Sequence, residues 1–134
     1  TYLGAGPEES YIDRCNATQI GLYHTTVTDL YTDYLKPQEC GNRTGVRYAT
    51  LVGQKKVFSL VAEPVMELNV SHWLPKEIEN TWHGKDLPPV TKTVVRCIAR
   101  QQGVGGYDSW GAHCNEKYKN KTDKTYRLKF QIRF

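Results

Sequence analysis

The sequence contains no long hydrophobic run, and no stretch approaches the ~18 apolar residues that a membrane span requires. It begins at Thr1 with neither a methionine nor a basic leader region. We therefore expect no signal peptide, and we expect a fragment or processed piece of a longer protein. Internal repeats, low-complexity linkers and alternating strand–helix patterns are also missing. These features predict one domain over residues 1–134, with no membrane partner.

Close cysteine pairs are absent too. The four cysteines form no C-x-x-C pair, although structural zinc sites usually contain at least one, so we expect no metal site here. An even number permits two disulfides, but a chain of 134 residues does not need them. We interpret Cys15, Cys40, Cys97 and Cys114 as buried free thiols.

An excess of charge of one sign is found only near the C-terminus; elsewhere basic and acidic residues nearly balance. The whole chain has 18 basic and 14 acidic residues, whereas residues 115–134 contain seven basic and two acidic ones. Arg127, Lys129 and Arg133 alternate there with apolar residues, as on the solvent face of a strand. We therefore interpret the basic excess as the wet face and turn of a closing hairpin, and we expect no nucleic-acid partner.

Strand periodicity is the main structural signal. Strict alternation over residues 125–134 predicts a strand with one buried face. We predict further strands at 19–33, 45–52, 56–62, 65–70 and 92–100, with a break at Glu63-Pro64, and a short helix at 74–79 with Pro75 at its first position. Turns are predicted at 4–9, 36–45, 83–89 and 103–111. This pattern predicts an all-β fold, an antiparallel β-sandwich.

Catalytic constellations are also lacking. Glycoside hydrolysis needs two facing carboxylates, but no neighbouring pair such as Glu8/Glu9 stands out, and the four histidines fit no nucleophile–base order. The glycines of 103–106 lack the Lys-Ser/Thr of a phosphate loop. We expect them to adopt positive φ or to let the backbone pass close to Trp110.

Aromatic residues in the predicted loops give one binding hypothesis. Flat rings stack on the apolar face of a sugar, and nearby carboxylates bind its hydroxyls. Carbohydrate contact by Trp82, Tyr107, Asp108 and Trp110 is therefore one interpretation. The alternative is that these rings cap the core at the end of a sheet.

Three motifs carry a family resemblance: G-P-x-E-x-Y-x-D-R at 6–14, P-Q-E-x-G-N-R-x-x-V-R at 37–47 and G-x-G-G-x-D-S-W-G at 103–111. In this order and spacing, over nearly the whole chain, they resemble the C-terminal portion of the large bacterial β-galactosidases of glycoside hydrolase family 2, the small-chain type of domain. The resemblance implies the second half of a galactose mutarotase-like supersandwich. Some members place a tryptophan against the substrate, and Val94 stands at that position here.

The resemblance also implies where the chemistry lies. The catalytic glutamates, with magnesium and often sodium, would lie in a preceding (β/α)8 barrel, so this chain alone is expected to be inactive and to hold no cofactor. The expected partner is the remainder of the parent chain, with a galactoside as a candidate ligand, in a bacterial cytoplasm or periplasm. A truncated sandwich would leave an apolar surface or a strand edge that favours self-association. An autonomous carbohydrate-binding module and an enzyme in its own right are the alternatives.

Within the motifs we expect mainly scaffold roles. The arginines can form bidentate bonds to Asp13, Glu9 or Glu39, which would tie long loops to the sheet. Gly41 and Asn42 suit a tight turn with positive φ, and Asp108 and Ser109 can bind the backbone of the glycine loop, with Trp110 packed over it. The residues assigned to this scaffold are Arg14, Glu39, Asn42, Arg43 and Arg47.

Overall fold

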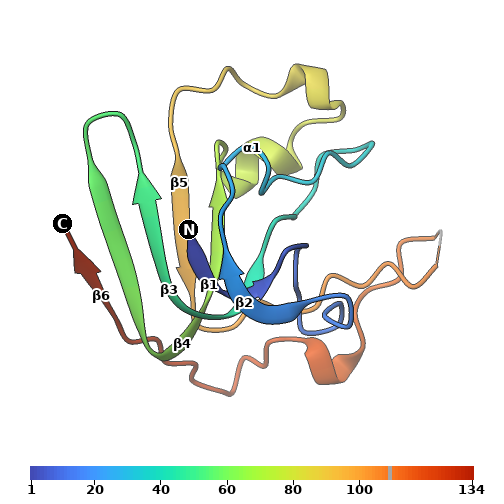
Figure 1. Ribbon diagram of the computed structural model, residues 1–134. Helices are drawn as coiled ribbons and strands as arrows, with labels where there is room; N and C mark the ends of the chain where they lie inside the picture. Colours follow the sequence, from blue (N-terminus) through green and yellow to red (C-terminus); the bar gives the residue numbers. More distant parts are fainter. Residues whose placement is uncertain (109) are drawn as a thin grey trace.

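The computed structural model describes residues 1–108 and 110–134, and its strands form one antiparallel sheet (Figure 1). The strands are β1 (Tyr2–Gly6), β2 (Gln19–Tyr23), β3 (Arg43–Val52), β4 (Val57–Ser71), β5 (Val94–Ile98) and β6 (Phe130–Arg133). A short helix α1 (Pro75–Glu79) and the 3₁₀-helices η1 (Gly84–Asp86) and η2 (Glu116–Tyr118) lie in the connections. None of the described helices is long and apolar enough to cross a membrane.

β4 is the centre of the sheet. The strand order is β2-β1-β3-β4-β5, and β6 also pairs with β4. The first half of β4 pairs with β6, its second half pairs with β5, and β3 runs along its other side. The all-β, antiparallel prediction is confirmed. The second sheet of a sandwich stays a prediction.

The core lies on one face of this sheet. Cross-strand register aligns Tyr2 with Ala49 and Ala49 with Leu60, so these side chains point to the same side. The buried cluster comprises Tyr2, Val46, Ala49, Leu60, Ala62, Met66, Leu68 and Val70. Val27 and Leu30, from the segment between β2 and β3, and Leu128 pack against it.

The opposite face is only half covered. Here the register aligns Leu22 with Leu3, Leu3 with Tyr48, and Tyr48 with Val61. We call the apolar residues on this side the open face: Leu3, Ile20, Leu22, Tyr48, Val52, Val57 and Val61. Ile20 and Leu22 are each 53% exposed, and Val52 is 75% exposed. The sheet thus has one face that carries the buried core and one face that stays largely open.

Strand β1 falls where a turn was predicted from Gly4 onward. Its glycines serve close packing, since a Cβ at Gly4 would lie 2.7 Å from Cγ2 of Val46, and one at Gly6 would lie 2.4 Å from the Tyr2 hydroxyl. The predicted turn was wrong over residues 4–6, because glycine in a strand can mark a close approach as well as a bend. The chain bends only after β1, at Pro7 and Glu8.

Two of the predicted strands are too long. The strand predicted over 19–33 ends at Tyr23, and the chain then crosses the core as a loop. The ten-residue strand predicted over 125–134 shortens to β6, which pairs with β4 instead of closing a hairpin. Ile132 and Phe134 are 52% and 98% exposed, so the predicted buried face was wrong at this end.

The remaining elements follow the sequence more closely. α1 is confirmed, with Pro75 at its first position, and β3 and β5 lie within or close to their predicted ranges. The predicted break at Glu63-Pro64 was wrong, because β4 continues through it. The exposed Pro64 lies where the register against β3 shifts, so its missing N–H leaves no ladder bond unmade.

Removing a core side chain from β4 should destabilise the sheet. Leu60 is 2% exposed and lies between β3 and β6, so we expect Leu60→Ala to lower the free energy of unfolding by about 3 kcal/mol. Val57→Ala on the open face is the matched control and should cost under about 1 kcal/mol. Urea unfolding followed by circular dichroism measures both, and equal losses would contradict this assignment of the core.

Candidate functional site

The first and third motifs meet at Asp13, which lies in the loop after β1. Its Oδ1 accepts a hydrogen bond from the Val104 amide at 3.0 Å, and its Oδ2 accepts bonds from the Gly105 amide at 2.9 Å and the Tyr107 hydroxyl at 3.1 Å. Desolvation opposes ionisation of Asp13, but these three donors outweigh it and hold the pKa below its ordinary value. One carboxylate therefore joins two loops about 90 residues apart in the chain.

The glycine loop is shaped as its composition predicts. Gly105 and Gly106 have φ of 69° and 77°, and a Cβ at Gly105 would lie 2.5 Å from the Ala112 carbonyl oxygen. Oδ1 of Asp108 accepts hydrogen bonds from the amides of Trp110 and Ala112 at 2.8 and 3.1 Å. The prediction that Asp108 binds the backbone of this loop is confirmed, whereas Ser109 lies outside the described residues.

The predicted carbohydrate residues lie in two separate segments of the chain. Tyr107, Asp108 and Trp110 share the glycine loop, and Trp110 is 93% exposed, so the prediction that it packs over the loop was wrong. Trp82 follows α1, where the Lys36 ammonium lies 4.4 Å from its ring centroid. In the described part of the chain, no hydrogen bond, aromatic pair or cation–π contact joins Trp82 to the glycine loop.

The first and second motifs meet at Glu9. Its carboxylate accepts hydrogen bonds from the Gly41 amide at 2.7 Å, from the Thr32 hydroxyl at 3.2 Å and from the Tyr34 hydroxyl. Arg14 Nη1 lies 3.6 Å from the same carboxylate and donates to the Tyr34 hydroxyl at 3.1 Å. The predicted tie between Arg14 and Glu9 is present, as a single long contact instead of a bidentate pair.

The second motif itself differs in part from its prediction. Gly41 has φ of 78°, as predicted, but Asn42 does not share the positive φ. Asn42 is buried and donates through Nδ2 to the Ser10 carbonyl oxygen at 2.9 Å and to the Glu67 carboxylate at 2.7 Å. Burial raises the pKa of Glu67, against the lowering effect of Asn42 and of the Gln101 amide. Asn42 thus fixes the loop to β4 through its side chain.

Among the residues that the structure describes, Arg43 has no ion-pair partner. It is 5% exposed and donates to neutral oxygens, namely the Tyr2 hydroxyl at 3.0 Å and the carbonyls of Pro7 at 2.9 Å and Gly41 at 3.0 Å. Its predicted pairing with a carboxylate was wrong, because backbone carbonyls surround the guanidinium. Arg47 is exposed, and no partner is found for it among the described residues.

The ion pair that does form at Glu39 was missed. Arg96, on β5, places Nη2 2.8 and 2.9 Å from the two carboxylate oxygens of Glu39. Asn69 Nδ2 donates to the same carboxylate at 3.1 Å. The available signal was the position of Arg96 within a β-branched strand, which placed a charge where apolar residues were expected.

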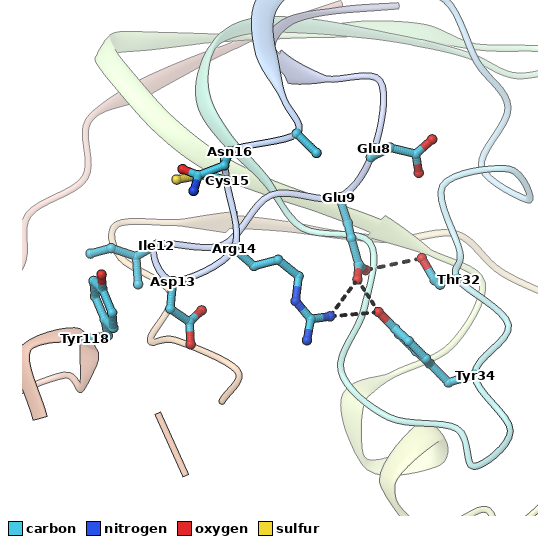
Figure 2. Close-up of a pocket in the computed structure, with 11 residues that line it drawn as sticks. Glu8, Glu9, Ile12, Asp13, Arg14, Cys15, Asn16, Thr32, Tyr34 and Tyr118 are labelled. Atoms are coloured by element: carbon cyan, nitrogen blue, oxygen red, sulfur yellow. Dashed lines mark hydrogen bonds and ion pairs between the residues drawn. The ribbon is translucent and has the colours of Figure 1, made fainter. Parts of the chain in front are cut away.

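The first motif, together with neighbouring loop residues and Tyr118, lines a cavity of about 570 Å³ (Figure 2). We call it the loop cavity, and its lining residues are Glu8, Glu9, Ile12, Asp13, Arg14, Cys15, Asn16, Ala17, Thr32, Tyr34 and Tyr118. Of the predicted site residues, Arg14 lines it, whereas Trp82, Tyr107, Asp108 and Trp110 do not. Desolvation and the hydrogen bond to Glu9 raise the pKa of Tyr34 to about 12, so its hydroxyl stays a donor.

Within the described residues, no three His, Cys, Asp or Glu side chains gather to hold a metal ion. All four cysteines are free. Cys40 and Cys114 are buried, Cys97 is partly buried, and Cys15 is exposed, so the prediction of buried thiols was wrong at Cys15. Burial raises the pKa of Cys40 to about 11, which keeps this thiol protonated and unreactive at neutral pH.

The antiparallel sheet, with loops joined by internal carboxylates, defines the class: an all-β domain. The family model described as "Beta galactosidase small chain" matches residues 1–132, and the chain belongs to this family. It is 37% identical over 134 residues to a β-galactosidase of Priestia megaterium and 39% identical to one of Halalkalibacterium halodurans. These matches cover 99% and 98% of this chain but 13% of each relative, so the chain spans about an eighth of their length.

The role of Asp13 predicts a pH-dependent loss of stability in Asp13→Asn. An amide offers one acceptor where the carboxylate offers two, so we expect the variant to unfold about 1–3 kcal/mol more easily at pH 7. The folded-state pKa of Asp13 lies below its ordinary 3.8, so the carboxylate stabilises the fold above that pH and loses this effect as the pH falls.

The difference between wild type and Asp13→Asn should therefore be constant above about pH 5 and shrink below about pH 4. Urea titrations across this range measure it, with the exposed Asp123→Asn as control. A difference that persists unchanged to the lowest pH would contradict the assignment.

Proposed function

We propose that this chain is the non-catalytic C-terminal domain of a β-galactosidase that hydrolyses terminal β-D-galactosides. The observation that carries the proposal is the family match over residues 1–132, together with the 13% coverage of full-length β-galactosidases. The remaining seven-eighths of such a protein would hold the catalytic barrel. This domain would then support that barrel.

The use of its acidic residues supports a non-catalytic role. Glu9, Asp13, Glu39 and Glu67 all accept hydrogen bonds from other loops or strands, so they act as structural ties. A retaining or inverting glycosidase instead needs one carboxylate free to protonate the leaving group and one facing the anomeric carbon. Any magnesium or sodium of the parent is proposed to bind in the preceding polypeptide, since the described residues of this chain gather no metal-binding cluster.

The open face is proposed as the surface against which the second sheet of a β-sandwich packs. Its apolar row from Leu22 through Leu3 and Tyr48 to Val61 has the alternation of an inner sandwich face, yet Leu22 is 53% exposed. A second sheet from the preceding polypeptide would bury this row and complete a β-sandwich of the galactose mutarotase-like kind. The parent chain is therefore the proposed partner.

Direct contact with a galactoside is a second candidate function. The exposure of Trp82 (71%), Tyr107 (52%) and Trp110 (93%) favours it, because stacking needs an accessible ring face. Two backbone amides engage Oδ1 of Asp108, so a sugar hydroxyl would have to bind at Oδ2. In this second function Trp110 is the strongest of the four residues.

Reconstitution tests the main proposal. Hydrolysis of nitrophenyl β-galactoside is measured for this chain, for the polypeptide that precedes or accompanies it, and for the two mixed. We expect activity from the mixture and at least a hundredfold less from either part alone, because the barrel lacks its support without this domain. Activity of this chain alone, or full activity of the other part alone, would overturn the proposal.

The open face predicts self-association when the parent is absent. Light scattering on the isolated chain should show dimers or larger species, and the double change Ile20→Lys with Leu22→Lys should shift it toward monomer. Leu35→Lys is the matched control, because Leu35 is 97% exposed but lies outside the open face. A strict monomer at high concentration would count against the proposal that this face seats another layer.

A further inference from the structure

The loop cavity is formed by segments far apart in the sequence. Residues 8–17 follow β1, Thr32 and Tyr34 precede β3, and Tyr118 belongs to η2. Figure 2 shows Tyr118 and Tyr34 at opposite ends, with Asp13, Arg14 and Glu9 between them. Its volume of about 570 Å³ falls within the range of small-molecule sites.

The cavity wall is held rigidly. The carboxylates of Glu9 and Asp13 accept hydrogen bonds from Thr32 and from backbone amides of the second and third motifs. These bonds fix the loops that form the cavity wall. Between them, the amides of Tyr11 and Arg14 each donate to the other's carbonyl oxygen, at 3.0 and 2.9 Å. A ligand would meet a preformed surface and would not have to order these loops on binding.

Other polar groups in the cavity have bonding capacity left. Arg14 uses Nη1 for Glu9 and Tyr34, which leaves Nε and Nη2 as donors. In the part of the chain that the structure describes, neither the Glu8 carboxylate nor the Asn16 side-chain amide has a hydrogen-bond partner. The cavity therefore offers donors, a carboxylate acceptor, and the ring of Tyr118 beside Ile12.

The charged side chains that line the loop cavity limit which kinds of ligand it can bind. Three carboxylates and one guanidinium line the cavity, so an anion such as phosphate would be repelled. A lipid would leave these polar groups without partners. A neutral molecule with adjacent hydroxyls can donate to Glu8, accept from Arg14 and Asn16, and rest an apolar face on an aromatic ring.

We propose that the loop cavity binds a neutral carbohydrate, a mono- or disaccharide. The site does not depend on the proposed function. It lies apart from the glycine-loop rings and from Trp82, and it needs no other part of a parent enzyme. Few hydrogen bonds to an open surface give an affinity in the millimolar range.

An amide-resolved NMR titration of the chain with galactose, lactose and maltose tests this site. We expect saturable shifts confined to residues 8–17, 32–34 and 118, and the sugar giving the strongest response identifies the preferred ligand. The absence of saturable shifts at tens of millimolar sugar would overturn the proposal. So would shifts centred on Trp82 or Trp110, which would support the second candidate function instead.

Variants locate the contacts. Glu8→Ala and Asn16→Ala each remove an exposed side chain with no internal bond, so the fold should survive, as a dispersed amide spectrum would show. Each should weaken sugar binding about tenfold, whereas Asp86→Ala and Trp110→Ala should leave it unchanged. Unaltered affinity in both cavity variants would overturn the assignment.

Because carboxylates dominate the charge of the cavity, a basic peptide is titrated as an alternative ligand. A short lysine-rich peptide, added under the same conditions, reports whether the charge serves a basic protein segment. Tighter binding of the peptide than of any sugar at residues 8–17 would overturn the carbohydrate proposal. Failure of the reconstitution assay would leave the sugar titration unaffected, so the two proposals fail separately.

Discussion

The architecture depends on two carboxylates that accept backbone amides from distant loops. Glu9 receives the amide of Gly41, and Asp13 receives the amides of Val104 and Gly105. Hydrogen bonds to a charged acceptor are roughly twice as strong as neutral ones, and each of these closes a loop of tens of residues. The three sequence motifs are therefore one structural unit, in which the first supplies the acceptors and the other two supply the amides.

A polar layer beneath the second half of β4 extends this unit into the sheet. Met66, Leu68 and Val70 face the core, whereas Glu67 and Asn69 face the loops, where Asn42 and Glu39 meet them. Tyr11 is fully buried in this layer and donates to Glu39, and burial raises the pKa of its hydroxyl, so it remains a donor. One long strand thus joins an apolar core on one side to a hydrogen-bonded layer on the other.

Local patterns predicted the parts of the fold that local physics decides. Proline at the first helical position located α1, and β-branched periodicity located β3 and β5, because both signals act over a few residues. The failures needed tertiary information. Gly4 and Gly6 lie in a strand in which Val46 and the Tyr2 hydroxyl come close to them. The sequence around these glycines has no apolar–polar alternation that would have predicted the strand.

The sequence predicted several of the residues that lie at the candidate site, but not which of them bond to one another. The motifs contain Arg14, Glu39, Asn42 and Arg43, and all four side chains make hydrogen bonds in the structure. Charge counting, however, could not place Arg43 among carbonyls or bring Arg96 to Glu39 across 57 residues. Which donor reaches which acceptor depends on loop paths that the sheet sets. The loop cavity was missed for the same reason, since Tyr118 and Tyr34 converge only after folding.

The two faces of the sheet explain why such a domain suits a supporting role. Rigid loops tied by Glu9 and Asp13 keep their shape without a partner, whereas the open face with Ile20 and Leu22 leaves apolar area that another layer could bury. Burial of that area would add stabilisation of about 25 cal/mol per Å² to the assembled protein. Figure 1 shows the motif loops toward the right of the view, and the β3–β4 hairpin with the C-terminus toward the left. A partner could therefore cover the open face while the loop cavity keeps the geometry that its own hydrogen bonds impose.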